Sequence, residues 1–181
     1  MKEPAMRPVL MIALALPVLA AGCAVTQPHQ SAPRRAEAVL RDANGQSAGR
    51  ALVRTSADGL WVDVQASGLT PGAHGLHVHA VGTCTAPDFA SAGPHWNPAG
   101  HQHGRKNPNG AHAGDAPNLM ADAKGRGRLK VWLSGALTGA DHALLDGDGA
   151  AIVIHADPDD EMTDPSGKSG KRVLCGVLTA R

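Results

Sequence analysis

Apolar and polar residues alternate along most of the chain, in short runs that are separated by turn residues. The first runs cover residues 38–42, 50–55 and 60–64, and an Asn-Gly pair at 44–45 and a polar stretch at 56–59 separate them. Such alternation is typical of strands with one buried face, and Asn-Gly is a strong hairpin signal. The pattern therefore predicts an antiparallel meander at the start of the domain.

Further runs of the same kind continue to the C-terminus, at residues 75–81, 118–123, 128–133, 150–156 and 172–180. The complete set predicts about eight strands, and no segment shows the apolar period of a long helix. We therefore expect an all-β fold, an antiparallel Greek-key barrel or sandwich. The stretches 82–117 and 157–171 break the rhythm, and loops of that length in a small domain usually carry function.

The start of the chain follows a different pattern, which is typical of an export signal. Two basic residues precede the apolar run 9–20, which is too short to span a bilayer. Small residues at 20–22 lead into Cys23, and this sequence resembles the lipobox of bacterial lipoproteins. We expect residues 1–22 to be a signal peptide and Cys23 to be lipidated. Because Ala20 stands where a lipobox prefers Leu, cleavage by an ordinary signal peptidase is the alternative.

Residues 23–35 carry Pro, Gln and Ser without an apolar period, and we expect a flexible tether there. Residues 36–181 then form a single domain. An exported chain of this kind is expected in the periplasm or cell envelope, with the lipid on Cys23 as its only contact with the membrane.

The composition excludes two broad classes of protein. The 181-residue chain is 43% hydrophobic, which is too apolar for a disordered protein. It has 17 Lys and Arg against 16 Asp and Glu, so it lacks the basic excess that would neutralise a nucleic-acid backbone. Without residues 1–22, which hold two basic residues and one acidic residue, the formal charges balance. The compositional feature that remains is the ten histidines.

Seven of the ten histidines fall between residues 74 and 112, and two of them form a His77-Val78-His79 sequence in a predicted strand. Side chains alternate faces along a strand, so both rings point the same way, roughly 7 Å apart, and can bind one metal ion. A polar strand face with two imidazoles is an equally good interpretation of this pair alone. Two other His-x-His families fit less well. Metallo-β-lactamases continue to an Asp-His pair that is absent here, and amidohydrolases need a larger β/α barrel.

A series of motifs contains these histidines and follows a fixed order. The motifs are Gly75-Leu-His-Val-His-Ala-Val-Gly-Thr-Cys84, Ser91-Ala-Gly-Pro-His95-Trp-Asn-Pro98, His103-Gly104, His112-Ala-Gly-Asp115, Val153-Ile-His155 and Arg172-Val-Leu-Cys175-Gly176. In this order they resemble copper/zinc superoxide dismutase, over residues 36–181. The resemblance implies an eight-stranded antiparallel Greek-key β-barrel or sandwich with a long metal-binding loop and a long electrostatic loop, in agreement with the strand pattern.

The resemblance also implies one copper and one zinc ion in each subunit. The implied copper ligands are His77, His79, His95 and His155, and the implied zinc ligands are His95, His103, His112 and Asp115. Imidazoles suit copper, and three imidazoles with one carboxylate suit a closed zinc site. His95 would bridge the two ions. We prefer His103 to His101 as the zinc ligand because the family's ligand directly precedes a glycine.

Further roles for individual residues come from the same resemblance. Asp159 matches the carboxylate that links a copper histidine to a zinc histidine, and an ordinary acidic loop residue is the alternative. Arg172 matches the guanidinium beside the open copper face, which attracts and orients a small anion, and an ordinary strand arginine is the alternative. Cys84 and Cys175 match the family's disulfide, which leaves Cys23 for the lipid.

The implied activity is the dismutation of superoxide to O2 and H2O2, in which copper is reduced by one superoxide and reoxidised by the next. Arg172 and His95 would act at the same site. In the cell envelope this reaction would remove superoxide that arises outside the cytoplasm. A non-enzymatic copper- or zinc-binding protein on the same scaffold is the alternative function. The sequence leaves both a monomer and a homodimer open.

The remaining notable residues match no motif. We expect surface positions for His29, His74 and His142, and ordinary solvated charges at Lys168 and Lys171. The tryptophans Trp61, Trp96 and Trp132 are expected to pack in the core.

Overall fold

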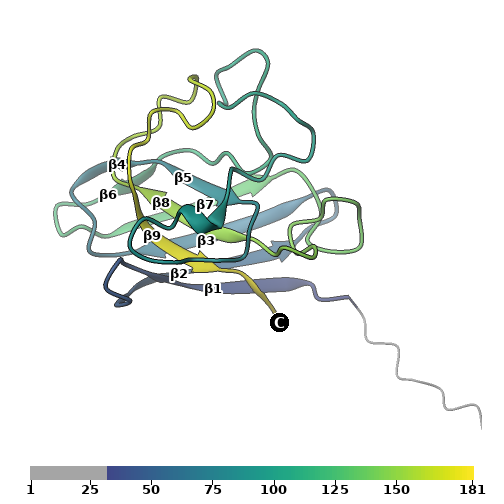
Figure 1. Ribbon diagram of the computed structural model, residues 1–181, viewed down its shortest axis with the longest axis horizontal. Helices are drawn as coiled ribbons and strands as arrows, with labels where there is room; N and C mark the ends of the chain where they lie inside the picture. The colour runs from purple at the N-terminus through teal and green to yellow at the C-terminus, as the bar shows by residue number, and fades with distance from the viewer. Residues whose placement is uncertain (1–31) are drawn as a thin grey trace, which may run out of the picture. The chain divides into compact units, whose positions relative to one another are not determined.

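Strands account for nearly all regular structure in residues 32–181, the part of the chain that the computed structural model describes (Figure 1). Their bounds are β1 Arg35–Arg41, β2 Ser47–Thr55, β3 Leu60–Ala66, β4 Gly72–His74, β5 Leu76–His79, β6 Leu119–Ala121, β7 Gly127–Leu133, β8 Ala151–His155, β9 Arg172–Val177 and β10 Thr179–Ala180. Within the same residues the only helical element is a 3-10 turn, η1, at Ala90–Ala92. The predicted all-β class is therefore confirmed.

The predicted signal peptide and Cys23 lie outside the described residues, as does most of the predicted tether. The first strand of the domain, β1, begins at Arg35, one residue before the boundary expected from the sequence. No helix among the described residues is long and apolar enough to cross a membrane.

The strands form where apolar and polar residues alternate. In β3, Leu60, Val62, Val64 and Ala66 are buried, while the residues between them are partly or fully exposed. Strands β1 and β2 follow the same pattern, and the first three strands pair antiparallel in sequence order. The predicted meander is thus confirmed, because each strand turns its apolar side to the same interior.

The first hairpin turn is wider than the predicted Asn-Gly pair. The amide of Gly45 donates to the carbonyl of Asp42 at 2.9 Å, and Gly45 has a φ of 77°, a value that favours glycine. The Asp42 carboxylate accepts the amides of Asn44 and Gln46, at 2.9 and 2.8 Å. The turn therefore starts at Asp42, because its side chain binds the free backbone donors.

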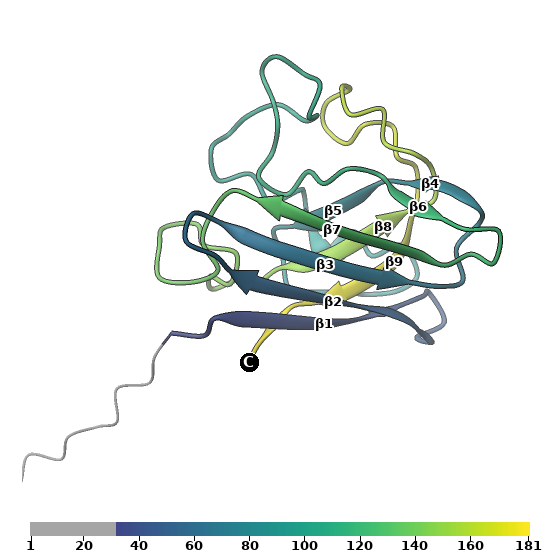
Figure 2. The same ribbon diagram turned by 180° about the vertical axis from the view of Figure 1, so that it is seen from behind.

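The sheet closes on itself. Its strands follow the order β4-β6-β7-β3-β2-β1-β9-β8-β5, with β10 paired to β1 (Figure 1, Figure 2). The two ends of this path, β4 and β5, are separated in the chain only by Gly75. The connections from β3 to β4 and from β7 to β8 cross over neighbouring strands, as in a Greek key. When β4–β5 and β9–β10 are each counted as one interrupted strand, the barrel has the eight predicted strands.

Strands β5 and β8 are buried on both faces, and this arrangement positions the candidate site. Their inward residues, including Val78 and Ile154, belong to the main core inside the barrel. Their outward residues, including His77 and His155, are also buried, because the loops 80–118 and 156–171 cover this wall. Figure 1 shows the two loops on the same side of the barrel, the first in teal and the second in yellow-green. The histidines therefore lie beneath the two loops, outside the barrel wall.

A disulfide ties the first long loop to the barrel. Cys84 in the loop bonds to Cys175 in β9, as the family resemblance implies. Around Cys175, a small apolar cluster outside the barrel contains Phe89, Ala92 and Val153. The loop is thus held both covalently and by packing against the wall that carries the histidines.

The tryptophans do not share one environment, which corrects the expectation that all of them pack in the core. Trp96 is buried, and its indole N–H donates to the carbonyl of His142 at 3.1 Å. Trp61 and Trp132 lie opposite each other on β3 and β7 and are 41% and 40% exposed. They are exposed because they stand in the outward phase of both strands.

Replacing both Cys84 and Cys175 with alanine should lower the free energy of unfolding by about 4–5 kcal/mol, because the bridge spans 91 sequence positions and so restricts the unfolded chain. Urea unfolding of the metal-free protein and of the variant would measure the difference. Reduced wild-type protein should behave like the variant. If the variant were as stable as the oxidised wild type, the bridge would not be a major stabilising element.

Candidate metal centre

The candidate ligand residues come together from two strands and one loop. Two histidines point outward from β5, and a third ends the neighbouring strand β8. The loop 80–118 carries the other candidate ligands, which are three histidines and one aspartate. It runs along β5, where the amide of Val78 donates to the carbonyl of Gly114 at 2.9 Å and the amide of Trp96 donates to the carbonyl of Val78 at 2.8 Å. These backbone bonds bring residues that are far apart in the sequence to one wall.

Four histidines form the first group of converging ligand atoms. One nitrogen each from His77, His79, His95 and His155 lies within 4.8 Å of the others. All of these rings are buried, and Nδ1 of His77 and Nε2 of the other three have no hydrogen-bond partner among the described residues. A buried polar atom without a partner costs about 1–3 kcal/mol, so four together indicate a ligand that binds them. Imidazole nitrogens in this number suit copper.

The outer nitrogens of these rings have protein partners that fix the ring orientation. The Nδ1–H group of His79 donates to the carbonyl of Gly93 at 2.8 Å. The Nδ1–H group of His155 donates to the carbonyl of Gly170 at 3.2 Å. With the hydrogen on the outer nitrogen, the inner nitrogen keeps its lone pair for a metal ion.

The second group gathers three histidines around one carboxylate oxygen. The Nδ1 atoms of His95, His103 and His112 lie 2.9, 3.1 and 3.4 Å from Oδ1 of Asp115. The corners of a tetrahedron with bonds of about 2.0–2.1 Å are about 3.3 Å apart, so this spacing fits a zinc site. Oδ2 of Asp115 accepts the amides of Gly104 and His112, at 2.9 and 3.0 Å, and these bonds fix the carboxylate.

Distance alone leaves a second choice of residues for this group. A ligand atom of His77 also lies within 4.8 Å of those of His95, His103 and Asp115. Both nitrogens of His77 are already engaged, one in the first group and one with a carboxylate. We therefore assign His112, and not His77, to the second group.

Two residues connect the groups directly. His95 has its Nε2 atom in the first group and its Nδ1 atom in the second. Asp159 accepts the Nε2–H of His77 at 2.7 Å on one oxygen and the Nε2–H of His103 at 3.0 Å on the other. Asn118 holds the backbone of Asp159 with hydrogen bonds of 2.8 Å in both directions. The groups therefore share a ring and a carboxylate, and Asn118 supports them although no sequence motif points to it.

Burial prepares the first group for metal binding at neutral pH. It lowers the pKa of His77 to about 4, that of His79 to about 2 and that of His155 to about 3. These rings are therefore uncharged near pH 7, and a metal ion does not compete with a proton for their inner nitrogens.

His103 and two carboxylates at the second group are charged near pH 7 in spite of burial. Burial lowers the pKa of His103, but its hydrogen bonds to Asp115 and Asp159 outweigh this effect and raise the pKa to about 9. Burial likewise favours the neutral form of both carboxyls, yet the hydrogen bonds from histidines hold the pKa of Asp115 and of Asp159 well below the usual range. Both carboxylates are therefore anionic, as a site for a divalent cation requires.

Arg172 begins β9 at the mouth of the centre. Its terminal nitrogens donate to the carbonyls of Phe89, at 2.7 Å, and Gly93, at 2.8 Å. Together with His95 and His155 it lines an open pocket of about 630 Å³. A half-buried guanidinium therefore faces the same opening as three of the candidate ligands, since His112 lines it too.

His74 is buried, which corrects the expectation of a surface position. Both of its ring nitrogens face carbonyl oxygens: Nδ1 lies 2.7 Å from that of His155, and Nε2 lies 2.8 Å from that of Thr70. The ring thus ties β4 to the end of β8, next to a candidate ligand. Its position in phase with the inward residues Leu76 and Val78 is the sequence signal that indicates burial.

The other two histidines among residues 32–181 contribute to neither group. His101 and His142 are exposed, and His29 falls outside the described residues. Nδ1 of His101 donates to the carbonyl of Ala111 at 3.1 Å, so this ring lines the pocket but does not join the converging ligand atoms. The arrangement favours His103 over His101 as a ligand.

Four converging imidazole nitrogens beside a histidine–carboxylate group, on the outer wall of a Greek-key barrel, define a class of protein with one site suited to copper and one suited to zinc. Comparisons with known proteins give the family. Residues 47–178 match the family model described as copper/zinc superoxide dismutase. The chain is 39% identical over 165 residues to Cu-Zn superoxide dismutase 2 of Aquifex aeolicus, a match that covers 89% of this chain and 96% of that protein. It is 42% identical over 149 residues to the Cu-Zn superoxide dismutase of Caulobacter vibrioides, covering 79% and 84%.

Solved structures show the same relationship. A SOD-like protein from Bacillus subtilis superposes with a TM-score of 0.75 at 38% identity, over 79% of this chain and 97% of that one. The clock protein EA4 superposes with a TM-score of 0.70 at 31% identity, over 83% and 97%. The chain therefore belongs to the copper/zinc superoxide dismutase family, a family of oxidoreductases, and its cofactors are copper and zinc.

Replacing Asp159 with alanine should weaken the binding of both ions about 10- to 100-fold, because His77 and His103 lose the partner that orients their inner nitrogens. Competition with a chelator, followed by metal analysis, would measure the two affinities separately. Asp157→Ala is the matched control, since Asp157 is exposed and belongs to neither ligand group. Equal losses in the two variants would contradict the role of Asp159.

Proposed function

We propose that this protein catalyses the dismutation of superoxide to O2 and H2O2. Copper is held by His77, His79, His95 and His155, and zinc by His95, His103, His112 and Asp115. The observation that carries the proposal is the position of four unpartnered, buried imidazole nitrogens beside the half-buried guanidinium of Arg172. A redox metal and a fixed cation in one pocket suit a small anion that exchanges one electron.

Bound copper would supply a one-electron redox couple, and bound zinc would supply a fixed positive charge next to His95. Arg172 attracts the anion and orients it, because its own orientation is set by the carbonyls of Phe89 and Gly93. Nε2 of His95 lies in the first group and is the atom that can hold a proton for the product, while Nδ1 stays with Asp115 in the second. The chain thus contributes substrate attraction and a proton site.

A non-catalytic metal-binding protein on the same scaffold is the second candidate function. The fold is shared with a Bacillus subtilis protein described as SOD-like and with a clock protein. One solved form of the Bacillus protein is a double mutant in which a tyrosine and a proline are replaced with histidine. In the present chain the candidate copper group already contains four histidines, and this supports catalysis.

We also infer that the protein is exported and protects the cell envelope from superoxide that arises outside the cytoplasm. Residues 1–22 then act as the signal peptide, residues 23–35 as a tether with a lipid on Cys23, and residues 36–181 as the catalytic domain. The pattern of the first residues supports this inference. So does the Cys84–Cys175 bridge, because disulfides persist in oxidising compartments.

Protein loaded with both ions should consume superoxide, and His155→Ala should abolish turnover while the protein stays folded and keeps zinc. The reason is that His155 contributes to the first group alone. A superoxide-consumption assay with metal analysis would check both parts. His142→Asn is the matched control, because His142 is exposed and belongs to neither group.

Two outcomes would contradict these assignments. Wild-type turnover in His155→Ala would refute the proposed copper ligands. Zinc binding without any turnover after copper is added to the wild-type protein would favour the non-catalytic function.

Arg172→Ala should lower turnover roughly tenfold or more and weaken its dependence on ionic strength, because the pocket loses its fixed cation. Turnover measured over a range of salt concentrations would show both effects. Lys171→Ala is the control, since Lys171 is the exposed neighbour and does not line the pocket. An unchanged rate and salt dependence in Arg172→Ala would remove this residue from the site.

A further inference from the structure

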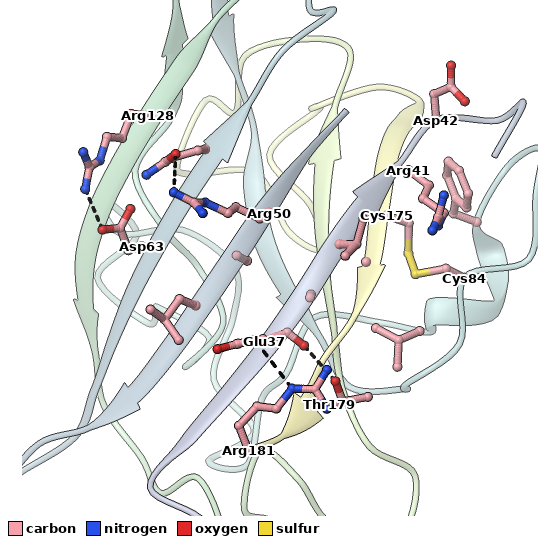
Figure 3. A pocket seen from close by; sticks show the side chains of 18 of the residues that line it. Glu37, Arg41, Asp42, Arg50, Asp63, Cys84, Arg128, Cys175, Thr179 and Arg181 are labelled. Carbon is pink, nitrogen blue, oxygen red and sulfur yellow. Dashed lines mark hydrogen bonds and ion pairs between the residues drawn. A yellow bond between two sulfur atoms is a disulfide. The ribbon is translucent and has the colours of Figure 1, made fainter. Parts of the chain in front are cut away.

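The outer face of β1, β2, β3 and β7 carries a broad cationic groove of about 1050 Å³, and Figure 3 shows side chains of these strands around it. Its basic residues are Arg41, Arg50, Arg54, Arg128, Lys130 and Arg181, and its acidic residues are Glu37, Asp42 and Asp63. The formal charges of residues 23–181 balance, so a basic excess on one face is local. Such a face attracts an anionic partner even though the whole chain has no net charge.

Each carboxylate in the groove is already engaged. Asp63 pairs with Arg128 at 2.8 Å, and Glu37 pairs with Arg181 at 3.5 Å. The third, Asp42, accepts the backbone amides of its own turn. In residues 32–181 no carboxylate forms an ion pair with the other basic residues of the groove, which are Arg41, Arg50, Arg54 and Lys130. Arg41 donates to the carbonyl of Gly45 at 2.8 Å and Arg50 donates to the side-chain oxygen of Gln65 at 3.3 Å, but both of these acceptors are neutral. The four positive charges are therefore not neutralised and can attract an external anionic surface.

Apolar and aromatic side chains stand beside these cations on the same face. Val39 lines the groove, and the exposed Trp61 and Trp132 stand next to its lining, in the same outward phase of β3 and β7 as Asp63 and Lys130. The ammonium of Lys130 lies 4.9 Å from the ring centroid of Trp61. Tryptophan next to lysine and arginine is typical of protein surfaces at the boundary between anionic lipid headgroups and acyl chains. The face thus combines basic side chains, which attract anionic lipid, with exposed aromatic rings, which can enter the headgroup region.

Docking through this face would leave the metal centre free. In the barrel order, β2 and β3 lie across from β5 and β8, which carry candidate ligands. Figure 1 and Figure 2 show the outermost parts of the two long loops on the side of the barrel away from β1 and β2, whereas Cys84, Ala86 and Phe89 of the first loop reach the edge of the groove. The pocket at Arg172 would therefore stay open to the aqueous phase.

The chain also enters the domain on this face. β1 begins at Arg35, which pairs with Arg54 of β2 in the sheet register. Eleven residues separate Cys23 from Arg35. A chain of that length spans at most ~40 Å when fully extended. A lipid on Cys23 would therefore hold the start of β1, at the edge of the cationic face, within that distance of the bilayer.

We propose that this face, which contains Arg41, Arg50, Arg54, Lys130, Trp61 and Trp132, docks on a membrane surface of anionic phospholipid headgroups. The cations attract the surface, and the tryptophan rings enter the headgroup region. A lipid anchor is commonly complemented by a basic patch in this way. The setting of the proposal rests on the proposed export and lipid anchor. The contact itself is made by the folded domain, so the proposal departs from the expectation that the lipid on Cys23 is the only contact with the membrane.

The test uses residues 23–181 with Cys23→Ser, so that no acyl chain contributes, and vesicles of phosphatidylethanolamine with phosphatidylglycerol. We expect the protein to sediment with these vesicles, to be released by high salt, and to show a blue shift of the emission from the exposed tryptophans. Each cation near an anionic bilayer contributes about fivefold in affinity, so Arg50→Glu with Arg54→Glu should weaken binding about 25-fold or more.

Lys168→Glu with Lys171→Glu is the matched control, because it makes the same change in charge on the loop at the metal side, and it should bind like the wild type. Circular dichroism would show that both variants are folded. Undiminished binding by the Arg50/Arg54 variant, equal binding to phosphatidylcholine vesicles, or no binding by the wild type would overturn the proposal. Binding to dextran sulfate but not to vesicles would also overturn it, in favour of a polysaccharide. None of these results depends on superoxide turnover, so a failure here is distinct from a failure of the proposed activity.

Discussion

Four buried imidazole nitrogens that lack a hydrogen-bond partner in the described residues determine how the rest of the centre is built. One unpaired buried atom costs free energy, and four in one place require a bound ligand to be tolerated. The surrounding chain places its hydrogen bonds on the opposite side of the rings, through the carbonyls of Gly93 and Gly170 and the carboxylate of Asp159. The lone pairs therefore point inward before an ion arrives, and metal binding completes a polar network that folding has prepared.

The metal centre lies on the outer face of the barrel wall and not inside the barrel. Its inside is filled by apolar side chains, so polar ligands can gather only on the outer face of β5 and β8, where long loops bury them. Close approach of the first loop depends on Gly114, since a Cβ there would clash with the carbonyl of Val78. The second loop depends in the same way on Gly167, where a Cβ would clash with the carboxylate of Asp159.

Alternation along the chain was enough to predict most strands and the shared outward direction of His77 and His79, because strand geometry is local. The order of the histidine motifs indicated the residues that the two groups contain. Closure of the sheet could not be predicted locally, since it depends on the pairing of β5 with the distant β8. The burial of His74 and the support from Asn118 were missed because both depend on tertiary partners. Trp61 was predicted to be buried because its side chain is apolar, but it stands in the outward phase of its strand and is exposed.

The carbonyls that hold Arg172 order its side chain before an anion binds, and this favours the binding of a very small anion. Ordering a long side chain at the moment of binding costs about 0.5–1.5 kcal/mol, and a diatomic anion has few atoms with which to offset that cost. Here the guanidinium is immobilised by Phe89 and Gly93, and the bridge at Cys84 holds their loop. The conformational entropy is lost once, when the chain folds, and each arriving anion meets a preorganised cation.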